Sequence, residues 1–133
     1  MRSTPAPAPG TSVVIEVTVK GVTSTEGRIR MALFASEDGF PGEPERALRR
    51  NQRPIGADTV RAFFIDVPEG RYAVSVLHDE DDDGKMKQDF MGRPKEGYGF
   101  SRDARGRLGP PGFDSAAFDA LGDTTRIVIE MEY

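Results

Sequence analysis

The sequence predicts an all-β protein: an antiparallel β-sandwich of about seven strands, with long loops and at most one or two short helices. Three observations support this fold class. Short stretches in which apolar and polar residues alternate, typical of half-buried strands, recur along the 133-residue chain. Segments rich in glycine, proline, serine and aspartate separate these stretches. The regular alternation of strands and helices that a parallel sheet requires is missing.

Two strands are expected near the start of the chain. In residues 12–20 (SVVIEVTVK) valine or isoleucine recurs at every second position, and residues 27–35 (GRIRMALFA) show a similar alternation. The connecting GVTSTEG is rich in turn formers. We therefore expect these two strands to form a hairpin.

Three later stretches alternate in the same way: residues 59–67 (TVRAFFIDV), 71–79 (RYAVSVLHD) and 124–133 (TTRIVIEMEY). Residues 68–70 (PEG) form a turn between the first two of them, because proline sets its own φ and glycine accepts a positive φ. These stretches complete the predicted sheets.

Only two segments favour a helix. Residues 42–52 (GEPERALRRNQ) carry glutamates early and arginines late, a distribution that suits the helix dipole. Residues 114–122 (DSAAFDALG) begin with a capping aspartate and end with a glycine, but they fit a short edge strand equally well.

Length and composition predict one domain and limit its function. Residues 12–133 are expected to form a single β-sandwich domain, after a disordered tail rich in proline and alanine at residues 1–11. The net charge of −4 argues against nucleic-acid binding, which requires a basic face. The absence of cysteine excludes disulfides and a thiol nucleophile. No apolar run approaches the roughly 20 residues of a membrane span.

The tail also bears on location. A proline- and alanine-rich stretch is typical of the segment that follows a removed signal peptide, which would place the protein in the periplasm or outside the cell. The alternative interpretation is a frayed N-terminus.

The main functional motif is HDEDDDGKMKQDFMG, which begins at His78. Asp79, Asp81 and Asp83 stand at alternate positions before a glycine, as in the front half of an EF-hand-type calcium loop. Calcium prefers oxygen ligands, and alternate carboxylates of a tight turn can converge on one ion. The backbone carbonyl of Lys85 would supply a further oxygen.

The back half of the motif departs from that pattern. Phe90 stands where a bidentate glutamate is usual, and Asp89, one place earlier, is a candidate additional ligand. A strand, not a helix, enters the loop. We therefore expect a calcium-stabilised turn on a sandwich and not an EF-hand; the alternative is a solvated, acidic strand end.

A second candidate site, for a small ligand or a substrate, combines His78 with Glu96, Tyr98 and Phe100. The alternative for His78, the single histidine, is a buried side chain with satisfied hydrogen bonds. The Gly–Tyr–Gly–Phe stretch indicates a positive φ or a close backbone approach. Its two aromatic side chains are also expected to pin a long loop onto the sandwich.

Residues 68–101 (PEGRYAVSVLHDEDDDGKMKQDFMGRPKEGYGFS) resemble a family of small bacterial exported proteins of uncharacterised function. That family's signature is similar to HDxNxNGKxD followed by GxPxEGYGFS. The flanking GRIRMALFASEDGF, GPPGFDSAAF and TTRIVIEMEY also resemble it, so the resemblance covers most of residues 12–133. It implies an immunoglobulin-like or transthyretin-like β-sandwich that is periplasmic or secreted, and no known reaction. Lys87 stands where the family often has an acidic residue, which weakens the calcium interpretation.

Three functions are consistent with these observations. The favoured one is a non-enzymatic binding or accessory module for a protein or small-molecule partner, with a calcium-stabilised loop. The second is an enzyme or small-ligand protein that uses His78, the acidic loop and Tyr98 with Phe100. The third is an interaction module that adds a partner strand to an exposed sheet edge.

Overall fold

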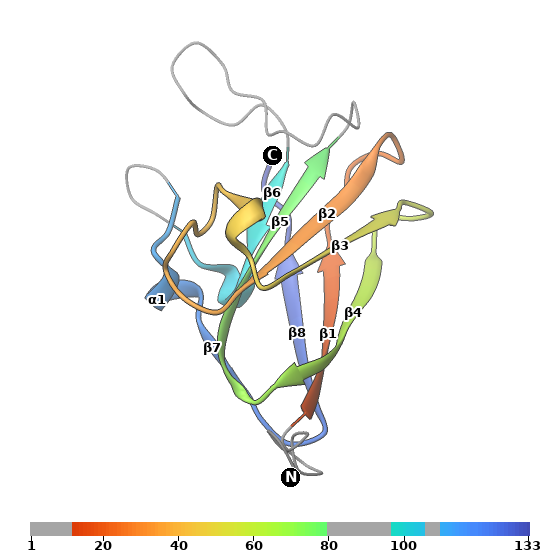
Figure 1. The fold of residues 1–133 in the computed structure, drawn as a ribbon. Coiled ribbons are helices and arrows are strands. Elements are labelled where there is room, and N and C mark those ends of the chain that lie inside the picture. The colour runs from red at the N-terminus through yellow and green to blue at the C-terminus, as the bar shows by residue number, and fades with distance from the viewer. Residues whose placement is uncertain (1–11, 80–96, 106–109) are drawn as a thin grey trace, which may run out of the picture.

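The computed structural model describes residues 12–79, 97–105 and 110–133, and within them eight strands form two packed sheets (Figure 1). The smaller sheet has the order β4-β1-β8, built from β1 (Ser12–Lys20), β4 (Val60–Pro68) and β8 (Thr124–Glu130). The larger sheet has the order β3-β2-β5-β6, and β7 pairs with the start of β5. Its strands are β2 (Arg28–Phe34), β3 (Arg49–Pro54), β5 (Gly70–Asp79), β6 (Tyr98–Phe100) and β7 (Phe118–Ala120). The predicted all-β sandwich is confirmed.

The core lies between the two sheets and is formed by alternate residues of the long strands. This follows from the period of two, because successive side chains of a strand point to opposite faces. The inward-facing side chains are buried and almost all apolar; they include Val13, Ile15, Val17 and Val19 of β1, Ile29, Met31 and Leu33 of β2, and Tyr72, Val74 and Val76 of β5. The intermediate positions of β1 are only partly buried, so this strand shows one face to the core and the other to solvent.

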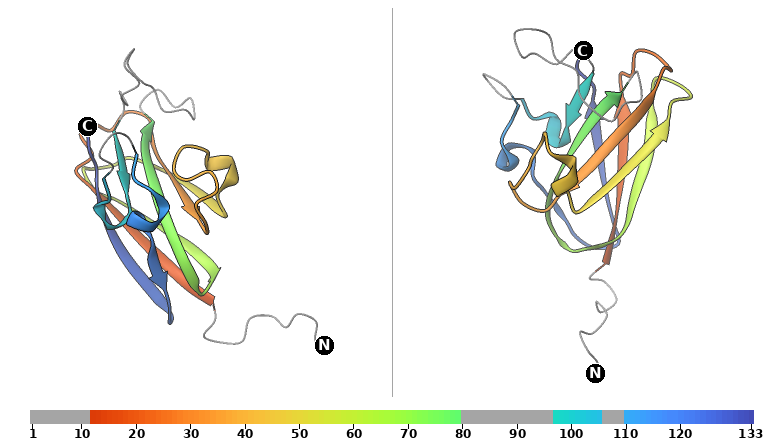
Figure 2. Two further views of the ribbon diagram at one scale, coloured as in Figure 1. Left: turned by 90° about the vertical axis from the view of Figure 1, so that its left-hand side faces the viewer. Right: turned by 45° about the horizontal axis from the view of Figure 1, so that its top comes forward.

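The predicted hairpin between the first two strands is wrong. β1 pairs antiparallel with β4 and parallel with β8, whereas β2 pairs antiparallel with β3 and β5 (Figures 1 and 2). The turn-rich segment after β1 therefore passes from one sheet to the other. A turn signal shows where a strand ends, but the burial of each strand's apolar face decides its partner.

The prediction of a helix at residues 42–52 is also wrong, apart from a 3-10 turn at Pro44–Arg46. The arginine-rich end of this segment is edge strand β3, which pairs with β2. Residues 114–122, for which a helix and an edge strand were both predicted, contain parts of each: helix α1 (Phe113–Ala116) is followed after one residue by β7.

Side chains of β3 close one side of the sandwich. In β4 a bulge adds a residue opposite β1, and Asp66 there adopts a φ of 55°. Arg49 donates hydrogen bonds to the carbonyl oxygens of Ile65 at 3.0 Å and Asp66 at 3.2 Å, and Asn51 donates to that of Phe63 at 3.0 Å. The free edge of β4 is thus covered by side chains of the opposite sheet.

Strand β6 closes the other side by crossing close to β8 and the residues that follow it. Tyr98 and Glu132 exchange two backbone hydrogen bonds, of 2.9 and 2.7 Å. A Cβ atom on Gly97 would overlap the Tyr133 ring, and one on Gly99 would lie 2.6 Å from Ile129 Cγ2. The close backbone approach expected for this glycine-rich stretch is therefore present, and neither glycine has a positive φ.

Tyr72 fixes the passage from β4 to β5. Its hydroxyl donates a 2.6 Å hydrogen bond to the carbonyl oxygen of Pro68, four residues upstream, while its ring lies in the core. Such a bond from the start of one strand to the preceding corner is a known device of β-sandwiches. Burial raises the pKa of the Tyr72 phenol, partly offset by the positive charge of Arg49.

Candidate functional site

The acidic motif starts where β5 ends, and only its first residues are described. Asp79 is fully buried, and Arg30 Nε donates to its Oδ2 at 2.7 Å in a salt bridge. Arg30 also donates to Gln52 Oε1 at 2.8 Å, so side chains of β5, β2 and β3 are linked at this end of the larger sheet. The remaining predicted calcium ligands lie outside the described residues: Asp81, Asp83, Lys85 and Asp89. A cation bound at Asp79 would share its carboxylate with a guanidinium group.

His78 is a fully buried side chain whose two ring nitrogens are both hydrogen-bonded. Nε2 lies 2.8 Å from the carbonyl oxygen of Glu26, which can only accept, so Nε2 carries a hydrogen. In the neutral ring Nδ1 then accepts from the Tyr133 hydroxyl at 2.7 Å, and that hydroxyl accepts from the Thr23 backbone N–H at 3.2 Å. The histidine thus ties β5 to the loop after β1 and to Tyr133, three residues after the end of β8.

The structure does not bring His78 together with the aromatic residues of the predicted ligand site. Tyr98 and Phe100 pair across from Leu77 and Ser75 of β5, and directly opposed residues point to the same face of a sheet. His78 points to the opposite, inner face. Glu96, the fourth member of this predicted site, lies outside the described residues.

An aromatic layer covers the outer face of the larger sheet. Phe40, from the loop after β2, makes edge-to-face contacts with Phe34, Phe100 and Phe113 at centroid distances of 5.2, 6.1 and 6.0 Å. Buried Ser101 fastens α1 beneath this layer: its hydroxyl accepts from the Val74 N–H at 2.9 Å and donates to the Ala116 carbonyl at 2.6 Å. The loop after β2 and the α1 segment are thereby held against the same face (Figure 1).

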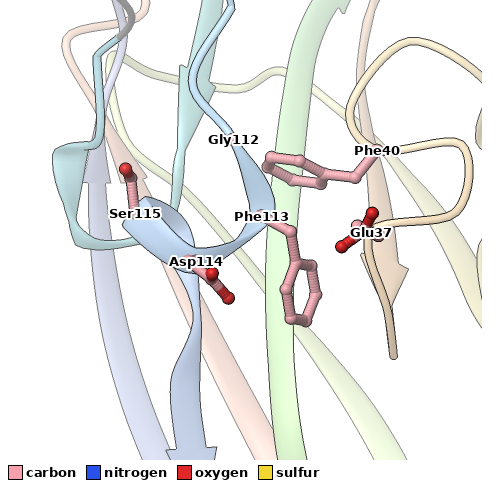
Figure 3. Close-up of a pocket in the computed structure, with 6 residues that line it drawn as sticks. All are labelled: Glu37, Phe40, Gly112, Phe113, Asp114 and Ser115. Atoms are coloured by element: carbon pink, nitrogen blue, oxygen red, sulfur yellow. The ribbon is translucent and has the colours of Figure 1, made fainter.

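Between these two segments lies an open cleft of about 290 Å³ (Figure 3). Its lining combines two aromatic rings, two carboxylates and a small backbone-exposing residue; the lining residues are Glu37, Phe40, Gly112, Phe113, Asp114 and Ser115. In the view of Figure 3 the Phe113 ring lies between the carboxylates of Glu37 and Asp114. Ligand pockets usually have apolar walls and volumes of roughly 300–1,000 Å³. This cleft is slightly smaller and its lining exposes more polar than apolar surface, so it suits a small ligand that carries a polar group.

The charges around the cleft are unevenly paired. Arg71 donates to Asp114 Oδ1 at 3.0 Å, and its guanidinium carbon lies 5.7 Å from the centroid of the Phe113 ring. Arg46 pairs with Asp38 Oδ1 at 2.9 Å. Over the ranges that the structure describes, the Glu37 carboxylate has no hydrogen bond or ion pair. The cleft therefore presents an unbalanced negative charge beside an aromatic ring.

The cleft residues were not found from the sequence. The two acidic–aromatic pairs, Glu37 with Phe40 and Phe113 with Asp114, stand in turn-rich segments far apart in the chain. The local sequence feature that the two segments share is a Gly–Phe dipeptide next to an acidic residue. Nothing in the local pattern shows that the two segments meet on one face of a sheet.

Three further observations concern the other predicted sites and partners. Among residues 12–79, 97–105 and 110–133 no group of three or more acidic or histidine side chains is close enough to hold a metal ion. The same residues contain no helix long and apolar enough to cross a membrane. In the smaller sheet both edges are partly occupied: Arg49 and Asn51 donate to carbonyl oxygens of β4, and Asp103 accepts from the Glu130 N–H of β8 at 2.9 Å.

Comparison with known proteins places the chain in a bacterial family. No curated protein and no solved structure matches it. A family model described as "Uncharacterized protein conserved in bacteria (DUF2141)" matches residues 17–128. This region holds most of the described sandwich, from within β1 into β8. Because the match covers well over half of its length, the chain belongs to DUF2141, a protein family conserved in bacteria.

Proposed function

We propose that this protein is a non-enzymatic binding module, exported to the periplasm or secreted, and that the cleft between the loop after β2 and the α1 segment is its recognition site. The cleft itself carries the proposal. Two phenylalanine rings and two carboxylates converge there on the outer face of a rigid sheet, and loops held by a rigid scaffold are common sites of recognition. Export is supported by the resemblance of residues 68–101 to exported proteins.

The geometry around His78 supports binding in preference to catalysis by that residue. Both of its ring nitrogens are engaged, and it is fully buried on the inner face of its sheet. A general base must reach the proton that it removes from a substrate. His78 accordingly serves to join strands, and the calcium-stabilised turn predicted after it serves to order the loop.

The cleft offers a direct test because one of its residues can be enlarged without strain. Gly112 has φ −79° and ψ 164°, an extended conformation that any residue adopts, and an added Cβ would meet no atom within 4 Å. Gly112→Leu therefore adds a bulky side chain to the lining of the cleft without straining the backbone, and we expect it to hinder binding there. Gly56→Leu is the matched control, because Gly56 is exposed in a remote loop and its added Cβ also meets nothing.

The experiment records backbone amide NMR spectra of the full chain while a set of cationic, neutral and anionic fragments is added. Binding in the cleft shifts the amide signals of Phe40, Phe113 and Ser115 in the original protein and in Gly56→Leu, but not in Gly112→Leu. If no fragment class shifts these signals, or Gly112→Leu responds like the original protein, the proposal is wrong. Chemical conversion of a fragment would refute its non-enzymatic part.

A further inference from the structure

We infer that the cleft recognises an organic cation, an ammonium or guanidinium group on a short apolar stem, and that Arg71 is its internal competitor. This inference rests on the proposed function of the cleft and adds the chemical class of its ligand. It begins with the pairing of an aromatic face and a carboxylate. The negative face of an aromatic ring attracts a cation, and a carboxylate accepts charge-assisted hydrogen bonds from it.

The protein already places one guanidinium group in this environment. Arg71 reaches from β5 to Asp114 at 3.0 Å and lies over the Phe113 ring at 5.7 Å from its centroid. Both members of the ion pair are open to water, with side chains 51 % and 89 % exposed. Exposed pairs of this kind are weak. A second cation can therefore displace Arg71 and take over the same ring and carboxylate.

Glu37 is a second carboxylate in the lining of the cleft, and the nearby arginines pair with other residues. Arg46 pairs with Asp38 and Glu43, at 2.9 and 3.7 Å, and Arg71 pairs with Asp114. In the described part of the chain this leaves the Glu37 carboxylate without a cationic partner. Since Glu37 lines the cleft with Phe113, an incoming cation gains an attraction that no residue in the described ranges already satisfies.

The size of the cleft limits the ligand. About 290 Å³ accommodates one cationic head group and a short chain, and its two phenylalanine rings suit an apolar stem. A free alkylamine and an arginine or lysine side chain of a peptide share this chemistry. A strongly anionic ligand would meet two carboxylates in the same cleft.

The test uses butylguanidinium and its neutral analogue butylurea, which have nearly the same shape and differ in charge. Amide NMR titrations of the full chain measure the affinity of each. Butylguanidinium is expected to bind the cleft at least roughly threefold more tightly than butylurea, the range expected of one exposed cation–aromatic contact. The tripeptide Gly-Arg-Gly, measured in parallel, shows whether a peptide side chain is preferred over the free cation.

Variants assign the effect to the named residues. Glu37→Gln should weaken butylguanidinium binding roughly threefold or more, whereas Arg71→Met should strengthen it by a similar factor because the competing guanidinium is removed. Asp58→Asn removes the same charge from a remote exposed loop and should change nothing. Circular dichroism of each variant confirms folding.

The outcomes separate this inference from the proposed function. Equal affinity for butylurea and butylguanidinium, or equal effects of Glu37→Gln and Asp58→Asn, would overturn the cation inference while leaving a functional cleft. Unchanged or weaker binding by Arg71→Met would overturn the role of Arg71. The absence of any cleft response to every fragment class would overturn the proposed function and this inference together.

Discussion

Replacing Tyr133 by phenylalanine removes one oxygen atom and breaks the hydrogen-bond network around His78. That hydroxyl donates to buried His78 Nδ1 at 2.7 Å and accepts from the Thr23 N–H at 3.2 Å. Leaving a buried polar atom without a partner costs about 1–3 kcal/mol. Thr23 is exposed, so water replaces the second bond at little cost. Because the Tyr133 side chain is itself 55 % exposed and water can reach its ring, we expect a loss of about 1–2 kcal/mol.

Urea unfolding monitored by circular dichroism measures this loss. With a denaturant dependence of about 2 kcal/mol per molar urea, Tyr133→Phe should lower the midpoint by about 0.5–1 M. Tyr98→Phe is the matched control, because within the described ranges the Tyr98 hydroxyl makes no hydrogen bond. If the two variants unfold at the same urea concentration, the assignment of the network to Tyr133 is wrong. Imidazole ¹⁵N shifts that place the hydrogen on Nδ1 would contradict the assigned tautomer.

Three further predictions follow from the same structure. Arg49→Met removes the hydrogen bonds to the β4 bulge and should cost about 1–2 kcal/mol in urea unfolding, whereas Arg50→Met on the same strand should cost far less; equal losses would contradict the closure of this edge. Because burial raises the pKa of Tyr72 above its unfolded value of 10.0, the folded state keeps its proton longer, so stability is full below pH 10 and is lost as pH rises above it. Tyr72→Phe should not lose stability in this way above pH 10. If its free energy of unfolding falls with pH as steeply as that of the original protein, the role of Tyr72 is refuted. Calcium should give heat in calorimetric titration of chelator-treated protein and raise its melting temperature, with both effects reduced in Asp83→Asn. No heat and no shift at millimolar calcium would reject the metal site.

The strands with a buried face were predictable because apolar residues recur at every second position along most of their length. β1, β4, β5 and β8 each place apolar side chains on every second position, and a helix cannot bury that pattern. β3 was not predictable, since its sequence, RRNQRP, has no apolar residue. It is a strand because the edge of β2 offers backbone partners and its arginine and asparagine side chains reach the opposite sheet. Local charge patterning favoured a helix there, and tertiary pairing overrode it.

The candidate sites were also predictable only in part. A buried, hydrogen-bonded His78 was one of the two interpretations of the sequence, and the close approach at Gly97 and Gly99 was expected from the glycine spacing. The partners of His78 were not predictable, because Glu26 and Tyr133 are far away in the chain. The cleft was not predictable either, because the two segments that line it, residues 37–40 and 112–115, are far apart in the chain.

In the long strands with an apolar face, the sequence alone determined which side chains face the core, since that depends only on the period of two along the chain. It also marked the acidic segment that begins at the end of β5, because a run of adjacent carboxylates is a local feature of the sequence. Tertiary structure alone decided which strands pair, that β1 and β8 run parallel, and that Glu37 and Phe113 share a cleft. These depend on contacts between distant segments. Their stability comes from burying two sheet faces against each other, and no local pattern specifies that arrangement.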